Sequence, residues 1–379
     1  MQVDMNIPEK NEQRVAFFLY ALGGGGAERV MLNLARGFVE RGILLDLVVG
    51  KAQGPLVSEI PDGVRLVNLG ATRLRRSLFR LIRYLRSEKP CALLSATTPV
   101  NLVALWAKHL SRSPVRVVIA IHNTFSQQVA RDSRAGGRLM TLLAKWTFPR
   151  ADAVVAVSRG AAEDFSRSIG FPEEKVRVIY NPVVLPSMFA RAREPVEHPW
   201  FAPGEPPVIL GVGRLTEQKD FGNLVRAFQA VRQEKQARLM ILGEGEDRPE
   251  IEKLVHALGL QEDVCMPGFV DNPYKYLASC DLFVLSSRWE GLPTVLIEAL
   301  ALGTPVVSTD CPSGPIEILE NGRLGRLIPI NTPDLLADAI VHSLGTAYDD
   351  REAKASTSRF TLDRVVGQYL ASLGLRGPS

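Results

Sequence analysis

Short apolar runs alternate along the chain with longer stretches in which apolar residues recur every three or four positions. The short runs are rich in Val, Ile and Leu, and most of them end at a glycine or a small polar residue. This alternation predicts strands and helices in turn, which form parallel sheets with helices on both faces. Strands covered on both faces are apolar at nearly every position, as these runs are. The predicted strands are Val15–Leu19, Leu44–Val49, Val64–Asn68, Ala92–Leu94, Val115–Ile121, Ala153–Val157 and Val176–Ile179 in the first half, and Val208–Gly211, Leu239–Leu242, Val264–Met266, Leu282–Leu285, Pro305–Ser308 and Arg326–Ile328 in the second.

A proline-rich stretch separates the two halves. It runs from Pro186 to Pro207 and also contains Pro195, Pro199, Pro203 and Pro206. This density favours a linker over a strand or a helix. Because 379 residues exceed the size at which single cores stop growing, we predict Rossmann-like domains at 12–185 and 208–350, joined by a linker at 186–207. Doubly wound sheets bind ligands at the carboxyl ends of their strands, so we expect one active site in an interdomain cleft.

The composition is that of an ordinary soluble globular protein, since 46% of the residues are hydrophobic and 23% are charged. A net charge of +4 is too small to indicate a nucleic-acid partner. The four cysteines are scattered without a Cys-x-x-Cys pair, which favours reduced thiols in the cytoplasm. Residues 1–13 are polar, unlike a signal peptide, and no run reaches the roughly 18 apolar residues of a membrane span. We therefore expect a cytoplasmic protein and leave contact with a membrane surface open.

The stretch from Arg288 to Leu300 places two carboxylates, Glu290 and Glu298, eight residues apart. Pro293 suits the start of a helix, so the amides of residues 294–296 would form a phosphate site. Glu298 has apolar neighbours, and we expect it to point toward packed surroundings, where ligand hydroxyls could satisfy its charge. Eight helical residues span roughly 12 Å, about the length of a nucleotide sugar. The alternative is a buried Glu298 paired with an arginine, with Glu290 solvated.

Two cations follow the first predicted strand of the second half. Arg214 comes directly after the strand end, and Lys219 stands five residues later, near the start of a helix. This arrangement suits a diphosphate, with bidentate contact from the arginine and a point charge from the lysine. The alternative is a surface pair between Arg214 and Glu217 with a solvated Lys219. A glycine run at residues 23–26 precedes a helix in the first half and would let backbone approach a phosphate or a sugar, although the motif alone is weak.

His122 follows a predicted strand of the first half and could contact a sugar hydroxyl or help to orient an acceptor. The alternative is a histidine satisfied by backbone groups. The sequence has no Asp-x-Asp pair and no His/Cys cluster with metal-ligand spacing. We therefore expect no metal, with diphosphate charge balanced by Arg214, Lys219 and helix amides. No nucleophile elbow, P-loop or Cys–His arrangement is present.

One segment is strongly basic, from Arg73 to Arg86. On a helix, Arg76, Arg80 and Arg83 would share one face, and Leu74, Leu78, Leu81 and Leu85 would share another. The simpler interpretation is a helix packed on the sheet with a solvated basic rim. The other is contact with anionic lipid or with the pyrophosphate of an acceptor.

The motifs together resemble those of family 4 retaining glycosyltransferases. The resemblance covers roughly Arg14 to Leu373, and its motifs are Arg288-Trp289-Glu290-Gly291-Leu292-Pro293 with Glu298, Gly213-Arg214-Leu215 with Lys219, and Gly24-Gly25-Gly26-Ala27-Glu28-Arg29. It implies the GT-B fold, an α/β fold of two Rossmann-like doubly wound parallel-sheet domains with a metal-independent interdomain cleft. Residues 12–185 would form the acceptor domain and residues 208–350 the nucleotide-sugar domain. A last helix, at residues 356–373, would cross back to the first domain.

The resemblance also assigns roles to residues by position. Glu290, Lys219, Arg214 and His122 would be catalytic. Glu298 would hold the ribose hydroxyls, Arg214 and Lys219 the diphosphate, and Glu290 the donor hexose. The resemblance also implies further contacts with the nucleotide sugar. Gly24 and Gly25 would close over its phosphates, and Val270 would lie in the turn that binds the base. Backbone amides would come from the stretch Leu292, Pro293, Thr294 and Val295.

The reaction implied by the resemblance is transfer of a hexosyl group from a nucleotide diphosphate sugar, commonly a UDP-sugar, with retention of the anomeric configuration. The acceptor would be a hydroxyl of a glycan or of a polyprenyl-diphosphate-linked saccharide in cell-surface polysaccharide synthesis. No cofactor and no nucleic acid would take part, and the inner face of the cell membrane is a possible place of action. Ile316 departs from the pattern, because many relatives carry arginine there. The alternatives are a nucleotide-sugar epimerase of the same fold and a non-catalytic sugar-nucleotide sensor.

Overall fold

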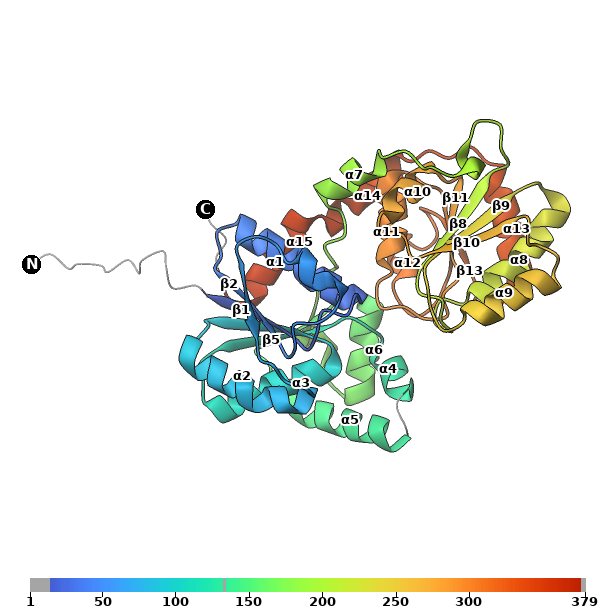
Figure 1. Cartoon of the computed structure of the whole chain (residues 1–379). Helices are drawn as coiled ribbons and strands as arrows, with labels where there is room; N and C mark the ends of the chain where they lie inside the picture. The colour runs from blue at the N-terminus through green and yellow to red at the C-terminus, as the bar shows by residue number, and fades with distance from the viewer. Residues whose placement is uncertain (1–13, 132–133, 376–379) are drawn as a thin grey trace, which may run out of the picture. The chain divides into compact units, whose positions relative to one another are not determined.

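The computed structural model describes residues 14–131 and 134–375, so the polar stretch at residues 1–13 lies outside the described residues. The chain divides into two compact units, each built around its own sheet (Figure 1). Among the described residues, the first unit takes in the chain from residue 14 to residue 157, residues 161–182 and residues 362–375. The second unit takes in residues 158–160 and 183–361.

The first unit contains a seven-stranded sheet in the order β3-β2-β1-β4-β5-β6-β7, and the paired strands are parallel. This is the order of a doubly wound fold, as the sequence predicts. Its strands are β1 (Val15–Leu19), β2 (Leu45–Val49), β3 (Val64–Asn68), β4 (Ala92–Ala96), β5 (Arg116–Ile121), β6 (Ala153–Ala156) and β7 (Val176–Val178). Its helices are α1 (Gly26–Glu40), α2 (Leu74–Glu88), α3 (Thr98–Ser111), α4 (Phe125–Arg131), α5 (Arg134–Thr147), α6 (Arg159–Ile169) and α15 (Leu362–Ser372), with short 3-10 turns at Pro55–Glu59, Phe148–Arg150 and Glu173–Lys175.

The second unit contains a six-stranded sheet in the order β10-β9-β8-β11-β12-β13, again with parallel pairs. Its strands are β8 (Val208–Val212), β9 (Arg238–Leu242), β10 (Val264–Gly268), β11 (Leu282–Leu285), β12 (Val306–Thr309) and β13 (Arg326–Ile328). Its helices are α7 (Pro186–Ala192), α8 (Phe221–Glu234), α9 (Arg248–Ala257), α10 (Pro273–Ser279), α11 (Thr294–Leu302), α12 (Pro315–Ile318), α13 (Pro333–Leu344) and α14 (Arg351–Ser356), with 3-10 turns at Pro199–Phe201 and Thr357–Phe360.

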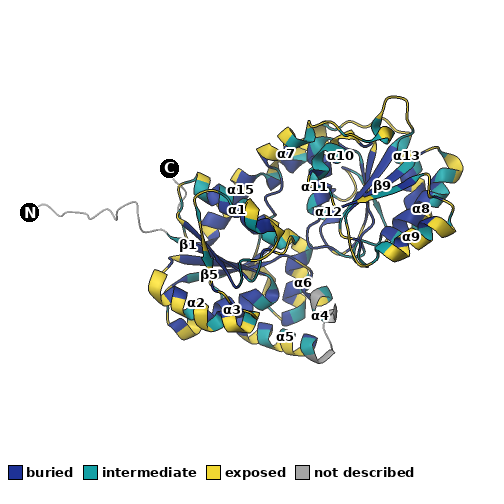
Figure 2. Cartoon of the chain, viewed as in Figure 1, coloured by how far each residue is buried: buried dark blue, intermediate teal, exposed yellow. Residues whose placement is uncertain are grey.

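All the strands predicted from the sequence are present, and their ends agree within two residues. The central strands of each unit are buried, edge strands such as β3 and β13 are more exposed, and the helices keep one exposed side (Figure 2). Burial on both faces is the reason that a continuous apolar run identifies these strands. None of the helices in the described part of the chain combines the length and apolarity needed to cross a membrane.

The prediction of an unstructured linker from Pro186 to Pro207 is wrong in part. Residues 186–192 form α7, and residues 199–201 form a 3-10 turn. In both, the proline stands in the first turn, where its missing N–H costs no hydrogen bond. Met188 of α7 is also buried, so the helix gains packing that proline content alone does not predict.

Helix α15 returns to the first unit and packs on α1. The approach is close, because a Cβ placed on Gly37 of α1 would lie 2.6 Å from a methyl of Val366. At the far end of the helix, Arg116 Nε of β5 donates to the carbonyl of Ser372 at 2.9 Å. The last helix is therefore an integral part of the first core.

A buried carboxylate ties β2 to its neighbours in the first unit. Asp46 is fully buried and accepts from Arg14 Nη1 at 2.7 Å, from Arg65 Nε at 2.8 Å and from the Tyr84 hydroxyl at 2.6 Å. Burial by itself raises the pKa of this carboxyl, but the hydrogen bonds from Arg65, Tyr84 and Arg14 outweigh it and bring the pKa below its usual value. Asp46 is therefore an ionised part of the scaffold.

Replacing Asp46 by Asn should destabilise the protein by about 1–3 kcal/mol, because buried donors lose their charged acceptor. The pKa of Asp46 is lower in the folded protein than in the unfolded chain. The stabilisation from its charge is therefore complete at pH values above the unfolded-state pKa, and it is lost as the pH falls through the folded-state pKa. Urea unfolding measures the free energy of unfolding of the wild type and of Asp46→Asn, and the difference between them should be smaller at about pH 3 than at neutral pH. The exposed Asp62→Asn serves as the control. A difference that is equally large at both pH values would contradict an ionised Asp46.

Candidate functional site

The direction of winding in the second sheet reverses between β8 and β11, which are neighbours although β9 and β10 follow β8 in the chain. Parallel sheets of this kind bind ligands beyond the carboxyl ends of the strands at such a switch point. Residues 213–220 leave β8 at this point, and residues 286–290 leave β11. The fold therefore brings together the two stretches that the sequence singles out.

Glu290 is the buried acceptor of this cluster, with 7% of its surface exposed. Its Oε1 accepts from Lys219 Nζ at 2.6 Å and from Ser287 Oγ at 2.7 Å. Its Oε2 has a longer contact with Gln218 Nε2, at 3.4 Å. A buried carboxylate needs a paired cation and further donors, and both are present here. The alternative of a merely solvated Glu290 is therefore excluded by its burial.

Backbone and side-chain bonds hold the two loops against each other. The amide of Arg288 donates to the carbonyl of Gln218 at 2.8 Å, and Ser286 Oγ donates to the carbonyl of Lys219 at 2.8 Å. Gln218 Nε2 also donates to the carbonyl of Trp289 at 3.0 Å. The sequence marks residues 286–290 as polar residues beyond a strand end, but it assigns no separate role to Ser287 or Gln218. Each stands within three residues of a predicted site residue, and this proximity is the feature of the sequence that could have identified them.

Two glycines allow the loop after β9 to approach the loop after β8. A Cβ on Gly243 would overlap the carbonyl oxygen of Gly213, and a Cβ on Gly245 would overlap that of Leu215. Leu215 N donates to the carbonyl of Glu244 at 3.0 Å, which fixes this approach. Any larger side chain at residue 243 or 245 would push the loop that carries Arg214 out of place.

Helix α11 begins four residues after Glu290 and has an uncapped start and one partly accessible side. No side chain caps its N-terminus after Pro293, so the first amides retain the partial positive charge of a helix start. Thr294, Glu298 and Leu302, spaced by four, are partly accessible, whereas the other helical residues are buried. Glu298 is therefore partly buried, and its apolar neighbours occupy the more deeply buried sides of the helix.

Arg214 is exposed and makes no hydrogen bond or ion pair with the residues that the structure describes. Glu217, the partner considered in the alternative interpretation, instead contacts Arg288 Nη1 at 3.4 Å. Arg288 is also bound through Nε to Asp220 at 2.8 Å. The alternative of an Arg214–Glu217 pair is therefore not what the structure shows. The guanidinium beyond β8 has no carboxylate to compete with an incoming anion.

His122 lies directly after β5 of the first unit and is 8% exposed. Neither Nδ1 nor Nε2 has a hydrogen-bond partner among the described residues. Burial lowers the pKa of His122 to about 4, so the ring is neutral near pH 7. The alternative of a histidine satisfied by backbone groups is therefore not observed. A buried imidazole without partners leaves one donor and one acceptor for a ligand.

The remaining predicted positions lie at the starts of two other loops. Gly24 has φ +89°, and Gly25 precedes the first turn of α1, which no side chain caps. The carboxylate of Glu28 folds back to the place that a Cβ on Gly25 would occupy, so an anion at this helix start would meet a like charge. Val270 is partly accessible, two residues beyond the end of β10 and next to the exposed Phe269.

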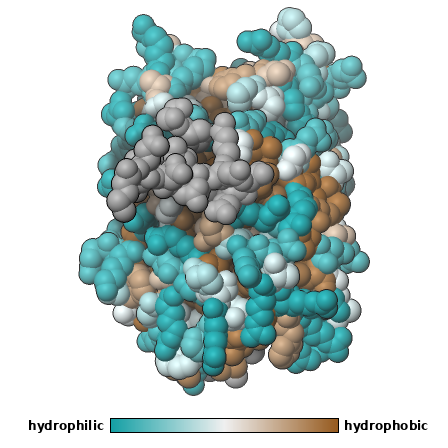
Figure 3. Space-filling view, turned by 90° about the vertical axis from the view of Figure 1, so that its left-hand side faces the viewer, coloured by the Kyte–Doolittle hydropathy of each residue, from teal (hydrophilic) through white to brown (hydrophobic). Residues whose placement is uncertain are grey.

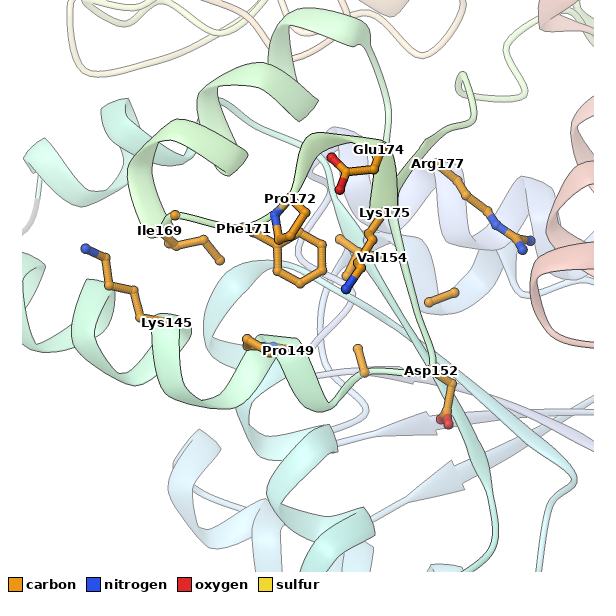
Figure 4. Close-up of a pocket in the computed structure, with 13 residues that line it drawn as sticks. Lys145, Pro149, Asp152, Val154, Ile169, Phe171, Pro172, Glu174, Lys175 and Arg177 are labelled. Carbon is orange, nitrogen blue, oxygen red and sulfur yellow. The ribbon is translucent and has the colours of Figure 1, made fainter.

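A pocket of about 430 Å³ lies in the first unit, at the amino ends of β6 and β7 (Figure 4). Its lining has mixed charge, with Lys145, Lys175 and Arg177 against Asp152 and Glu174. Amino ends of parallel strands lie at the opposite edge of the sheet from carboxyl ends, so this pocket is distinct from the surroundings of His122. No group of three metal-ligating side chains occurs among residues 14–131 and 134–375.

Two family models match the chain, on either side of the proline-rich stretch. Residues 24–185 match the model described as Glycosyltransferase Family 4, and residues 193–353 match the model described as Glycosyl transferases group 1. The first match contains Gly24, Gly25 and His122, and the second contains the cluster around Glu290. The candidate residues of both units therefore fall within matched regions.

Individual proteins match over nearly the whole chain. The N-acetylgalactosamine-N,N'-diacetylbacillosaminyl-diphospho-undecaprenol 4-alpha-N-acetylgalactosaminyltransferase of Campylobacter jejuni is 29% identical, over 93% of this chain and 96% of its own. The lipopolysaccharide core biosynthesis glycosyltransferase LpsE of Rhizobium meliloti is 28% identical, over 92% of this chain and 96% of its own. A crystal structure of HepE from Anabaena in complex with UDP superposes with a TM-score of 0.77 at 22% identity, covering 96% of this chain and 100% of that one. This likeness confirms the predicted α/β fold of two Rossmann-like units.

The imidazole of His122 should remain neutral from pH 8 down to about pH 5, because its burial disfavours the charged form. Since its folded-state pKa lies below its unfolded value near 6.5, protonation weakens the fold only as the pH falls below that value. Proton NMR of the imidazole signals, assigned with His122→Gln, measures the midpoint. A midpoint near 6.5 for His122 would show that water or a partner group reaches the ring.

Proposed function

Since the chain belongs to the glycosyltransferases that contain these two family domains, we propose that it transfers a hexosyl group from a nucleoside diphosphate sugar, with UDP as the nucleotide. The observation that carries this proposal is the Lys219–Glu290 ion pair, which lies at the switch point of the second sheet. The exposed Arg214 and the uncapped start of α11 lie beyond the ends of the same neighbouring strands. Cations, helix amides and carboxylates are the groups that a sugar diphosphate requires.

The donor is held along the first turns of α11. The diphosphate binds the amides at Thr294 and Val295 and the guanidinium of Arg214, while backbone near Leu292 and Pro293 borders the hexose. Glu298 lies one turn beyond Thr294, which is roughly 6 Å along the helix axis. Its carboxylate therefore reaches a ribose that follows the diphosphate, and the turn at Val270 faces the base.

Lys219 binds both Glu290 of the protein and the diphosphate of the nucleotide sugar. Its ammonium group has three protons and donates to Glu290 Oε1, which leaves capacity for a phosphate oxygen. Glu290, fixed by Lys219 and Ser287, accepts hydroxyl protons of the hexose. The neutral ring of His122 offers one hydrogen-bond donor and one acceptor to a sugar hydroxyl.

The transfer retains the anomeric configuration. The bond between the anomeric carbon and the phosphate oxygen breaks, and the acceptor hydroxyl oxygen bonds the same carbon from the same face. The departing diphosphate takes the proton of that hydroxyl. Arg214, Lys219 and the helix amides stabilise the charge that develops on the diphosphate, which is the main catalytic term of this mechanism. No metal ion is required, because these groups supply the positive charge.

The acceptor we propose is a hydroxyl of a glycan or of a polyprenyl-diphosphate-linked saccharide in the synthesis of a cell-surface polysaccharide. Support comes from the relatives, of which one is named for a diphospho-undecaprenol substrate and another for the lipopolysaccharide core. Such an acceptor places the enzyme at the inner face of the cell membrane.

Glu298→Ala should raise KM for the UDP-sugar by roughly 10- to 100-fold, because a charge-assisted hydrogen bond to the ribose is lost. Lys219→Ala should lower kcat by roughly 100-fold or more, because the leaving group loses stabilisation in the transition state. Steady-state kinetics with a UDP-sugar and a lipid-linked saccharide measure both constants. The exposed Glu234→Ala, at the end of α8, is the matched control.

A thermal-shift screen with UDP-, GDP- and ADP-sugars identifies the nucleotide, because a ligand that binds the folded state raises the melting temperature. UDP-sugars should give the largest shift, and Glu298→Ala should reduce it. Full activity in both Glu298→Ala and Lys219→Ala would overturn the site. Conversion of a UDP-sugar to an epimer without any acceptor would identify an epimerase instead.

A further inference from the structure

Helix α5 carries an apolar stripe on its outer side. Leu139, Leu142 and Trp146 are 57%, 65% and 67% exposed. Their spacing of three and four places them on one face of the helix. Other α5 residues, such as Ala144, are buried in the first core, so this helix is apolar on both its inner and its outer side. Soluble monomers rarely leave large adjoining apolar side chains in water without a use for them. We call Leu139, Leu142 and Trp146 the α5 stripe.

Cations border the α5 stripe, and the segment that carries it contains no carboxylate, although Asp152 and Glu174 line the pocket that Lys145 also lines. Arg138, Lys145 and Arg150 are exposed, and no Asp or Glu occurs between residues 134 and 150. The guanidinium of Arg150 lies over the ring of Trp146, 4.3 Å from its centroid. Long basic side chains around an aromatic ring are typical of surfaces that lie at the boundary between lipid headgroups and acyl chains.

Helix α2 adds a second aromatic ring among arginines. Phe79 is 75% exposed, and Arg75, Arg76 and Arg83 are its neighbours three or four residues away. Some arginines of this helix form hydrogen bonds within the protein, since Arg80 donates to the carbonyl of Leu69 and Arg76 donates to the hydroxyl of Thr72. The basic face predicted from the sequence is thus present, but part of its hydrogen-bonding capacity is satisfied locally.

Helix α3 joins these two helices into one surface. Arg86 of α2 donates to the carbonyl of Leu110 at 3.1 Å, and Trp106 of α3 donates to Thr147 of α5 at 3.2 Å. Leu110 is itself 50% exposed. Figure 2 shows the exposed sides of α2, α3 and α5 along the same side of the first unit. Figure 3, which looks from the side of Figure 1 on which α2 lies, shows mainly hydrophilic side chains with hydrophobic patches among them.

We propose that the outer sides of α2, α3 and α5 form a membrane-docking surface for an anionic lipid bilayer. The α5 stripe enters the boundary between headgroups and acyl chains, and the surrounding arginines and lysines bind lipid phosphates. Charge complementarity favours this occupant over a second copy of the chain, because a symmetric contact through the α5 stripe would bring its cations together. The inference deepens the proposed function, on which it rests only for a reason to hold the enzyme at a bilayer.

Sedimentation of the full chain with vesicles tests the surface. Vesicles of phosphatidylcholine with about one third phosphatidylglycerol should bind the protein more tightly than phosphatidylcholine alone, and added salt should weaken the binding. Leu142→Glu and Trp146→Glu should each reduce this binding by about tenfold or more, because a charge would enter the acyl boundary. Lys145→Glu should reduce binding to the anionic vesicles specifically. Leu335→Glu, at a leucine of α13 that is 47% exposed, is the matched control.

The outcomes separate this surface from the proposed function. The variants should keep the wild-type melting temperature and the wild-type thermal shift with a UDP-sugar, since the α5 stripe does not include the residues assigned to the donor. No binding to anionic vesicles at low salt would overturn the proposal, as would binding that survives Leu142→Glu and Trp146→Glu. Light scattering that shows a dimer disrupted by the same variants would identify a contact between copies instead. Vesicle binding without any transferase activity would leave the surface standing and remove the proposed function.

Discussion

The ion pair between Lys219 and Glu290 depends on the strand order of the second sheet. Because β8 and β11 are neighbours, residues separated by 71 positions in the chain meet at one sheet edge. The backbone bonds between the two loops then fix the lysine and the carboxylate in place, and Gly243 and Gly245 permit the third loop to support them. The same edge leads into α11, so the helix amides and Glu298 follow from the same constraint. A change in strand order would separate all of these groups.

Asp46 and Glu290 are the buried carboxylates among the described residues, and their surroundings differ. Asp46 lies within a strand and is surrounded by Arg14, Arg65 and Tyr84, whose positions are set by packing. Glu290 lies just beyond a strand end, where parallel sheets bind their ligands, and its cation is a lysine with further protons to donate. Both charges are satisfied, as burial requires. Glu290 differs from Asp46 in its place at the carboxyl edge of the sheet, where Arg214, which has no partner among the described residues, also follows a strand end.

The sequence predicts the sheets well, because a strand buried on both faces needs an apolar side chain at almost every position. It predicts less well where a single residue type has two uses. Proline density indicates a linker, yet Pro186 begins α7, since proline also suits a first helical turn. Apolar neighbours suggest a packed Glu298, and the helical period leaves it partly buried, on the same side of α11 as Thr294. The α5 stripe was not recognised, because leucines that face water and leucines that face the core follow the same period along one helix.

The sequence cannot predict that His122 has no hydrogen-bond partner among residues 14–131 and 134–375, or that Lys219 pairs with Glu290, because both depend on which side chains meet in space. We infer that the charges at the switch point of the second sheet hold a sugar diphosphate. A crystal structure of the protein soaked with UDP would locate the nucleotide. We expect the diphosphate against Arg214, Lys219 and the first amides of α11, with the ribose hydroxyls on Glu298. UDP bound elsewhere, or held to the protein through a divalent ion, would contradict it.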